Sequence, residues 1–202
     1  MNNIILKGII RNIQPSHTIK NVDYDKAELI VKRKDGKEDL LNLRFKKYTN
    51  KYKDLDEINI TGNVRSYSQQ LSENKNKVEI YVYTYFDLPE DTSDEEITNQ
   101  VVIDGRVCKI DHINKENNKP NLHFILANNM MVHNNTSKIN NYIPVQCWNE
   151  VATCNSDLKV NDKVIITGEL HSREYKKQID DENYEVRVAH EIVAAKIEVV
   201  KE

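Results

Sequence analysis

The groups in this sequence best suited to binding chemistry are aromatic and basic side chains, and many of them fall on apolar segments. Residues 142–148 alternate between apolar and other side chains. Successive side chains of a strand point to opposite faces, so this alternation predicts that Tyr142 and Trp148 face outward. The inward set opposite them is Ile143, Val145 and Cys147.

A second segment repeats this alternation. With Val164, Ile166, Gly168 and Leu170 inward, Arg173 and Tyr175 share the outward face, and the neighbouring residues are Lys176 and Lys177. Exposed aromatic rings flanked by cations suit unstacked nucleotide bases, because each stacked base contributes about 1–3 kcal/mol. One alternative stays open, in which Trp148 caps the end of a barrel or lies under the helix that follows it.

The first half of the chain carries aromatic and basic residues at other positions. The inward set Leu41, Leu43 and Phe45 leaves Asn42, Arg44 and Lys46 facing outward. Outward aromatics are predicted at Tyr67 and in an alternating stripe of tyrosines. This stripe could stack bases or form a protein interface, where tyrosine is enriched, and the pattern slightly favours the interface. The residues of this second candidate surface are Arg44, Lys46, Arg65, Tyr67, Tyr81, Tyr83 and Tyr85.

A hairpin turn is predicted at residues 34–37, which read Lys-Asp-Gly-Lys. Four basic residues lie at its tip, and we expect them to be solvated or, alternatively, to clamp phosphates. They are Lys32, Arg33, Lys34 and Lys37.

No set of side chains predicts catalysis or metal binding. The six histidines have no partners at metal-binding or triad-like spacing. The sequence has no G-x-x-x-x-G-K-[ST] phosphate loop, and its three cysteines lack metal-ligand spacing. We therefore expect reduced thiols, no metal, no cofactor and no enzymatic activity.

The elements that must position these residues occur twice. Residues 2–8 match residues 99–105, and residues 56–64 match residues 161–170, each pair sharing a glycine within an apolar strand. A glycine weakens a strand unless the strand bends sharply or another backbone approaches closely, as in small closed barrels. The repeat predicts a domain at residues 1–88, an acidic linker at 89–98 and a second domain at 99–202.

Each half reads as five strands, with a short helix between the third and the fourth. This pattern is typical of the OB-fold, so we predict an all-β chain with two tandem OB-fold five-stranded Greek-key barrels. A single β-sandwich is the main alternative, and the repeat argues against it. The strands are expected at 3–13, 26–34, 38–46, 57–67, 78–86, 100–111, 121–129, 141–149, 162–175 and 184–199, and the helices at 47–54 and 149–157.

Composition places limits on these readings. The 202 residues are 39% hydrophobic and 30% charged, and no apolar run is long enough to span a bilayer. Residues 1–11 do not have the features of a signal peptide, so we expect a cytoplasmic protein without membrane association. The net charge of −3 argues mildly against nucleic-acid binding, although one basic, aromatic face is sufficient for it.

The second half resembles bacterial single-stranded DNA-binding proteins of the SSB family. Residues 102–107 and 122–129 resemble the first two strands of that family, and residues 191–194 resemble its closing strand. The most specific stretch runs from Tyr142 to Lys177. There the family has an aromatic residue, an apolar strand, Trp-Gly-Lys-Leu-Ala, Leu-Lys-Lys-Gly, another apolar strand, Glu-Gly-x-Leu and Thr-Arg-x-aromatic.

This resemblance implies roles for single residues. The family positions that match Tyr142, Trp148 and Tyr175 carry aromatics that stack on DNA bases. We expect the neighbouring cations to neutralise phosphates; they are Arg106, Lys109, Arg173, Lys176 and Lys177.

The sequence also departs from the family pattern. Asn149 replaces a glycine, and Asn161-Asp162 replaces a Lys-Gly turn. The family's long tail with an acidic tip is absent, so recruitment of partner enzymes by that route is not expected. Two barrels per chain are similar to SSB variants in which a dimer supplies four barrels, so we expect self-association, as a dimer.

The expected function is sequence-tolerant binding and protection of single-stranded DNA in replication, recombination or transfer of a bacterial or mobile element. The alternative is a tandem-OB scaffold of a replication or conjugation complex with weak nucleic-acid affinity. Binding of RNA stays open, because base stacking does not distinguish ribose from deoxyribose.

Overall fold

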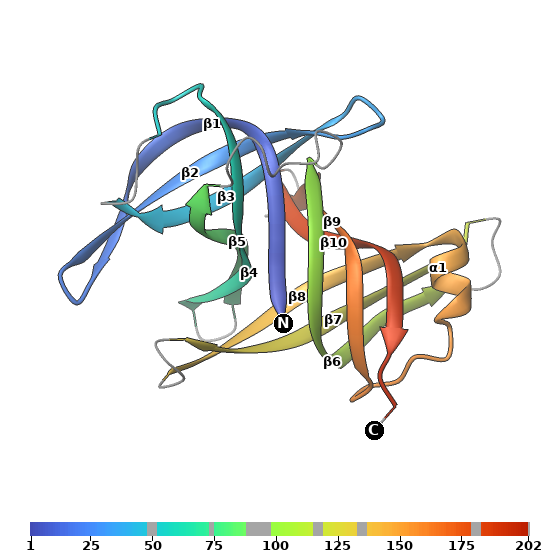
Figure 1. Cartoon of the computed structure of the whole chain (residues 1–202). Coiled ribbons are helices and arrows are strands. Elements are labelled where there is room, and N and C mark those ends of the chain that lie inside the picture. The colour runs from blue at the N-terminus through green and yellow to red at the C-terminus, as the bar shows by residue number, and fades with distance from the viewer. Residues whose placement is uncertain are drawn as a thin grey trace.

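The computed structural model describes residues 1–47, 52–72, 75–87, 98–114, 119–132, 137–178 and 183–201. Ten strands and one short helix follow each other along the described chain (Figure 1). They are β1 (Asn2–Ile19), β2 (Val22–Lys32), β3 (Glu38–Lys46), β4 (Glu57–Ser72), β5 (Lys75–Asp87), β6 (Asn99–Asn114), β7 (Asn121–Val132), β8 (Ser137–Trp148), α1 (Asn149–Cys154), β9 (Lys163–Gln178) and β10 (Tyr184–Val199).

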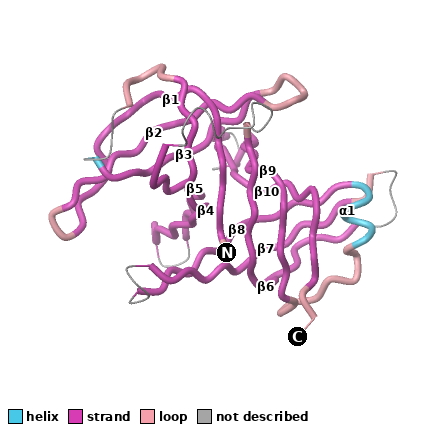
Figure 2. Tube along the Cα trace, in the orientation of Figure 1, coloured by secondary structure: helices cyan, strands magenta, loops and turns pink. Residues whose placement is uncertain are grey.

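Strand pairing forms two rings, one in each half of the chain. In the first, β1 pairs with β2 and β4, β2 with β3, β3 with β5, and β5 with β4. In the second, the strands β6 to β10 repeat the same connections. Among the strand pairs of the described residues, only β3–β5 and β8–β10 are parallel. The two tandem OB-fold barrels predicted from the sequence are confirmed (Figure 2).

The predicted elements agree with the structure at most positions. All ten strands lie where they were expected, and several extend further as hairpins beyond the barrels. The helix expected at 149–157 is α1, while most of the helix expected at 47–54 lies outside the described residues and residues 52–54 are not helical. The linker expected at 89–98 also lies outside the described residues apart from Thr98, so the domain boundaries stay a prediction.

Each barrel encloses the inward set that alternation predicted. Leu41, Leu43 and Phe45 are at most 1% exposed, and Ile143, Val145 and Cys147 are fully buried.

The matched glycines explain how the strands cross so closely. A Cβ atom on Gly8 would lie 2.3 Å from the carbonyl oxygen of Ile30, and one on Gly105 would lie 2.5 Å from that of Ala127. Any side chain at these two positions would therefore collide with a neighbouring backbone.

The two barrels are joined by antiparallel pairing of β1 with β6. Asn2 lies opposite Ile103 and Leu6 lies opposite Asn99, about a centre where Ile4 faces Val101. Because Asn2 and Leu6 are the repeat equivalents of Asn99 and Ile103, this contact has the symmetry of a two-fold dimer interface within one chain.

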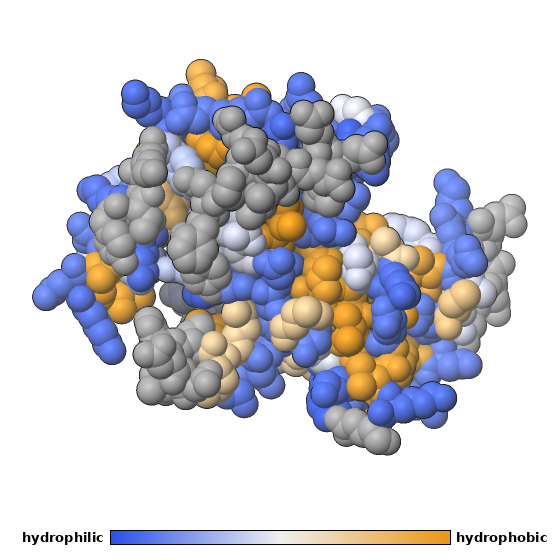
Figure 3. Space-filling model, in the orientation of Figure 1, coloured by the Kyte–Doolittle hydropathy of each residue, from blue (hydrophilic) through white to orange (hydrophobic). Residues whose placement is uncertain are grey.

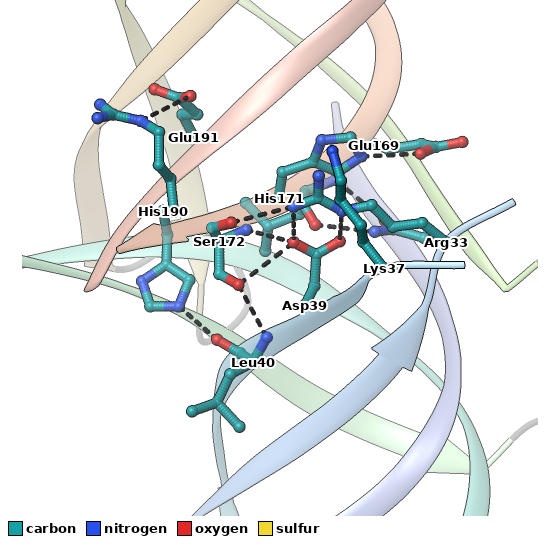
Figure 4. A network of polar contacts seen from close by, with 12 residues as sticks. Arg33, Lys37, Asp39, Leu40, Glu169, His171, Ser172, His190 and Glu191 are labelled. Atoms are coloured by element: carbon teal, nitrogen blue, oxygen red, sulfur yellow. Dashed lines mark hydrogen bonds and ion pairs between the residues drawn. The ribbon is translucent and has the colours of Figure 1, made fainter. Parts of the chain in front are cut away.

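Two serines extend this symmetry on either side of the central strand pair. On one side, the backbone N–H of Ser66 donates to Asn141 Oδ1 (3.0 Å), and Ser66 Oγ accepts the N–H of Tyr142 (2.8 Å). On the other side, the N–H of Ser172 donates to Asp39, and Ser172 Oγ accepts the N–H of Leu40 (2.8 Å; Figure 4). We call these the Ser66 junction and the Ser172 junction.

The Ser172 junction also holds one residue of the β2–β3 hairpin tip. Arg33 binds the carboxylate of Asp39 with two nitrogens and donates to the carbonyl oxygen of Ser172 (3.0 Å; Figure 4). The side chain of Asp39 is fully buried. The expectation that Arg33 is solvated or clamps phosphates is therefore wrong, because its guanidinium neutralises a buried carboxylate between the barrels.

Candidate nucleic-acid interface

Strand β8 carries two half-exposed aromatic rings on one face. Tyr142 is 52% exposed and Trp148 is 46% exposed, while the opposite face of the strand is buried. The two residues are six positions apart, which in an extended strand is about 20 Å. Trp148 is the residue before α1, with extended backbone, and Asn149 then takes a left-handed φ of 50°. The alternative that Trp148 lies beneath the helix does not fit its exposure.

The β9–β10 hairpin brings a third aromatic ring and several charges toward β8. Strand β10 lies between β8 and β9, and the strand registers place Tyr175 roughly level with Tyr142. Tyr175 is 37% exposed and contacts the side chain of Arg187. A hydrogen bond from the Arg187 side chain to Glu185 raises the pKa of that arginine, so its charge is secure beside Tyr175.

The cations of this hairpin differ in their exposure and in their ion pairing with nearby carboxylates. Arg173 is 61% exposed and lies 3.7 Å from a carboxylate oxygen of Glu191, a distance at which the pair is loose. Lys176 is exposed, and Lys177 is half-buried. These three side chains lie along β9, from the level of Tyr142 onward, where they can approach a phosphate backbone.

The structure does not gather Arg106 and Lys109 with these aromatics. Both belong to β6, which is separated from β8 by β7. Arg106 donates to the carbonyl oxygen of Asn161 (2.9 Å), and Lys109 forms an ion pair with Asp111. The hydrogen bond from Lys109 lowers the pKa of Asp111, so this pair stays ionised over a wide pH range.

The first barrel carries its own aromatic and cationic face, on the outer side of β2, β3, β5 and β4. The guanidinium of Arg44 lies between two rings, 4.2 Å from the centre of Tyr81 and 5.5 Å from that of Tyr67. Arg65 covers the ring of Tyr83 at 4.0 Å. Tyr67 is 48% exposed, but Tyr83 is only 9% exposed and so lies beneath its neighbours. The side chain of Tyr85 lies outside the described residues.

Sequence reasoning missed three residues of this first-barrel face. His17 stacks on Tyr24 with parallel rings 4.8 Å apart, and Lys26 lies opposite Arg44 in the β2–β3 pair. Burial and the nearby charge of Arg44 lower the pKa of His17. The signal for Tyr24 and Lys26 was present, because both have the parity opposite to the inward set of Ala27, Leu29 and Val31. The position of His17 depends on the length of the β1–β2 hairpin, which the sequence pattern underestimated.

Two observations bear on other functions, and both concern only the part of the chain that the structure describes. None of its helices has the length and apolar character needed to cross a membrane. No group of three or more His, Cys, Asp or Glu side chains there could hold a metal ion.

Comparison with known proteins gives agreement at the level of family and of fold. The model of the single-strand binding protein family matches residues 98–200. No curated protein matches the chain by sequence. The solved structure of the wild-type single-stranded DNA binding protein from Thermus aquaticus is 17% identical, with a TM-score of 0.72 over 100% of this chain and 94% of that one. A deletion mutant of the same protein gives the same identity and score, with 95% of that chain covered.

Proposed function

Since the chain belongs to the single-strand binding protein family, we propose that it binds single-stranded DNA, without sequence preference, along β8 and the β9–β10 hairpin. One observation carries the proposed site. Tyr142 and Trp148 are half-exposed rings on one face of a strand whose other face is fully buried. A buried strand holds the rings in place, so little conformational entropy is lost when bases stack on them.

The remaining residues of the site have distinct parts in this proposal. Tyr175 provides a third ring for stacking, and Arg173, Lys176 and Lys177 neutralise phosphates along the hairpin. Arg106 and Lys109 lie farther around the barrel, and we propose that they contact the strand only where it continues past β7. Such charge contacts release counterions, so affinity falls as salt rises.

We also propose a biological setting. The protein covers and protects single strands in the cytoplasm during replication, recombination or transfer of DNA, and has no catalytic role. Copies of the chain associate as a dimer. Figure 3 shows an apolar area over β6, β9 and β10, which supports a covered surface there.

The proposed site can be tested through its own tryptophan. Trp148 is the single tryptophan of the chain, so its fluorescence reports directly on β8. We expect strong, salt-sensitive quenching by a poly-pyrimidine single strand and little quenching by duplex DNA. Titration with the matching RNA shows whether the sugar matters. Absence of quenching at low salt, with the protein folded, would refute the site and favour a scaffold function.

A further inference from the structure

We propose that Arg187 positions the side chain of Tyr175, so that the phenolic hydroxyl of Tyr175 donates a hydrogen bond to an oxygen of the bound strand. This inference rests on the proposed function, in which Tyr175 supplies a ring for stacking. It adds a polar contact at that ring and a second residue, Arg187, that acts on the strand through its neighbour. The accepting oxygen belongs to a base carbonyl or to a phosphate, and these two sources can be distinguished by experiment.

Tyr175 lies on a part of the β9–β10 hairpin whose other face is open to solvent. On that other face Lys176 is exposed, Val186 is 61% exposed and Val188 is 40% exposed. A two-stranded ribbon without a packed face is only marginally stable, so it holds its side chains less firmly than a barrel strand does. A fixed position for Tyr175 therefore requires a restraint other than packing on the barrel core.

Arg187 supplies such a restraint from the neighbouring strand. It lies directly opposite Tyr175 in the β9–β10 register, and the two side chains are hydrogen-bonded to each other. The Nε and Nη2 atoms of Arg187 contact one carboxylate oxygen of Glu185, at 2.7 and 2.5 Å. A guanidinium is planar and rigid, so these two contacts fix its plane and the direction of its remaining N–H groups. Glu185 thus orients Arg187 toward Tyr175.

The exposure of the arginines separates this role from direct binding of phosphate. The side chain of Arg187 is 27% exposed and is bound on two sides, by Glu185 and by Tyr175. Arg173, on the same face, is 61% exposed and lies 3.7 Å from its nearest carboxylate oxygen, on Glu191. Arg173 is the better placed of the two to meet a phosphate, and Arg187 is the better placed to hold a neighbouring side chain.

The chemistry of the contact determines what the hydroxyl of Tyr175 can do. An arginine side chain has N–H donors and no acceptor, so Arg187 donates and the phenolic oxygen accepts. This bond does not use the hydroxyl hydrogen, and an oxygen that accepts from a cation becomes a stronger donor through polarisation. Single-stranded DNA offers oxygen acceptors on its phosphates and on the carbonyl groups of thymine, cytosine and guanine. The hydroxyl hydrogen of Tyr175 is suited to such an oxygen.

The experiment titrates the full chain with poly-thymidine and with poly-deoxyadenosine and follows the fluorescence of Trp148. Tyr175→Phe keeps the ring and removes the hydroxyl, so we expect affinity to decrease about two- to tenfold, as for loss of one hydrogen bond. A decrease on poly-thymidine alone identifies a base carbonyl, which adenine lacks, and an equal decrease on both strands identifies a phosphate. Tyr184→Phe removes a hydroxyl from the opposite face of the same hairpin and should leave both affinities unchanged.

A double-mutant cycle tests the positioning role. Arg187→Lys keeps the charge but not the planar fork, and we expect it to weaken binding about as much as Tyr175→Phe does. In the Tyr175→Phe background the same change should have no further effect, because the atom that Arg187 holds is gone.

Two results would overturn the inference. One is that Tyr175→Phe binds both strands as tightly as the parent protein while Trp148 is still quenched. The other is that Arg187→Lys weakens binding equally in both backgrounds, since Arg187 would then act independently of the hydroxyl of Tyr175. Absence of quenching in the parent protein would instead refute the proposed function itself.

Discussion

Ser66 and Ser172 occupy equivalent positions in the two barrels, and each makes the same pair of hydrogen bonds to the other barrel. The partners differ in charge. Ser66 meets the neutral amide of Asn141, whereas Ser172 meets the buried carboxylate of Asp39, which Arg33 neutralises. The chain is therefore an internal dimer whose two junctions have diverged, and Tyr142 takes part in the Ser66 junction where Leu40 takes part in the Ser172 junction.

Removal of Arg33 should be costly for stability. Arg33→Ala leaves the carboxylate of Asp39 buried without its cation, and breaking such a pair costs about 3 kcal/mol or more. Urea denaturation measures this loss as a decrease in the free energy of unfolding. The double variant that adds Asp39→Asn copies the neutral Ser66 junction and should recover much of the loss. No recovery would show that Arg33 stabilises the junction by packing rather than by charge.

Acidic pH should weaken the Ser172 junction. His190 donates from Nε2 to the carbonyl oxygen of Leu40 (2.7 Å), and burial lowers its pKa below the ordinary value of 6.5. A lowered pKa in the folded state means that the unfolded chain binds more protons, so stability is complete above pH 6.5 and falls as pH decreases toward the folded pKa.

This pH dependence can be assigned by substitution. Thermal melting between neutral and mildly acidic pH should show a smaller decrease for His190→Gln than for the parent protein. His17 contributes with the same sign, because its pKa is also lowered, so the slope should not vanish. Equal slopes in the two proteins would mean that His190 does not titrate with unfolding.

Crowding at the matched glycines predicts a loss of stability when a side chain is added. A Cβ atom on Gly168 would lie 2.2 Å from the carbonyl oxygen of Val193, so Gly168→Ala must shift one of two paired strands. We expect a loss of about 1–3 kcal/mol in the free energy of unfolding, measured by denaturant titration. Thr167→Ala, next to it on the outer face, serves as the control. An unchanged stability would contradict the close approach of β9 and β10.

Truncation of Trp148 should affect binding rather than folding. Trp148→Ala removes a half-exposed ring, and loss of one stacked base corresponds to a decrease in affinity of about fivefold to a hundredfold. Polarisation of a labelled oligonucleotide measures the affinity, and circular dichroism checks the fold. Trp148→Phe should retain most of the binding. Loss of the fold in Trp148→Ala would instead assign this ring to the core.

Local patterns in the sequence predicted the strands, the paired glycines and the outward direction of Tyr142 and Trp148, because strand parity depends only on near neighbours. The same logic failed for Arg33, because its carboxylate partner Asp39 is bound in turn by Ser172, which is 133 residues from Asp39. Parity also predicted that Tyr83 lies outside the barrel, yet could not show that Arg65 and Tyr24 cover it. Contacts between the barrels follow from the β1–β6 pairing, and no short segment of sequence encodes it.

The most direct test of the binding face is photo-cross-linking of the full chain to a single-stranded oligonucleotide that carries 5-iododeoxyuridine, followed by mass spectrometry of the linked peptides. Stacked aromatic side chains react efficiently with this base, so the linked residues mark the path of the strand. We predict links at Tyr142 and Trp148. Links confined to the outer face of β1, β6 and β9, with none on β8, would contradict the proposed site.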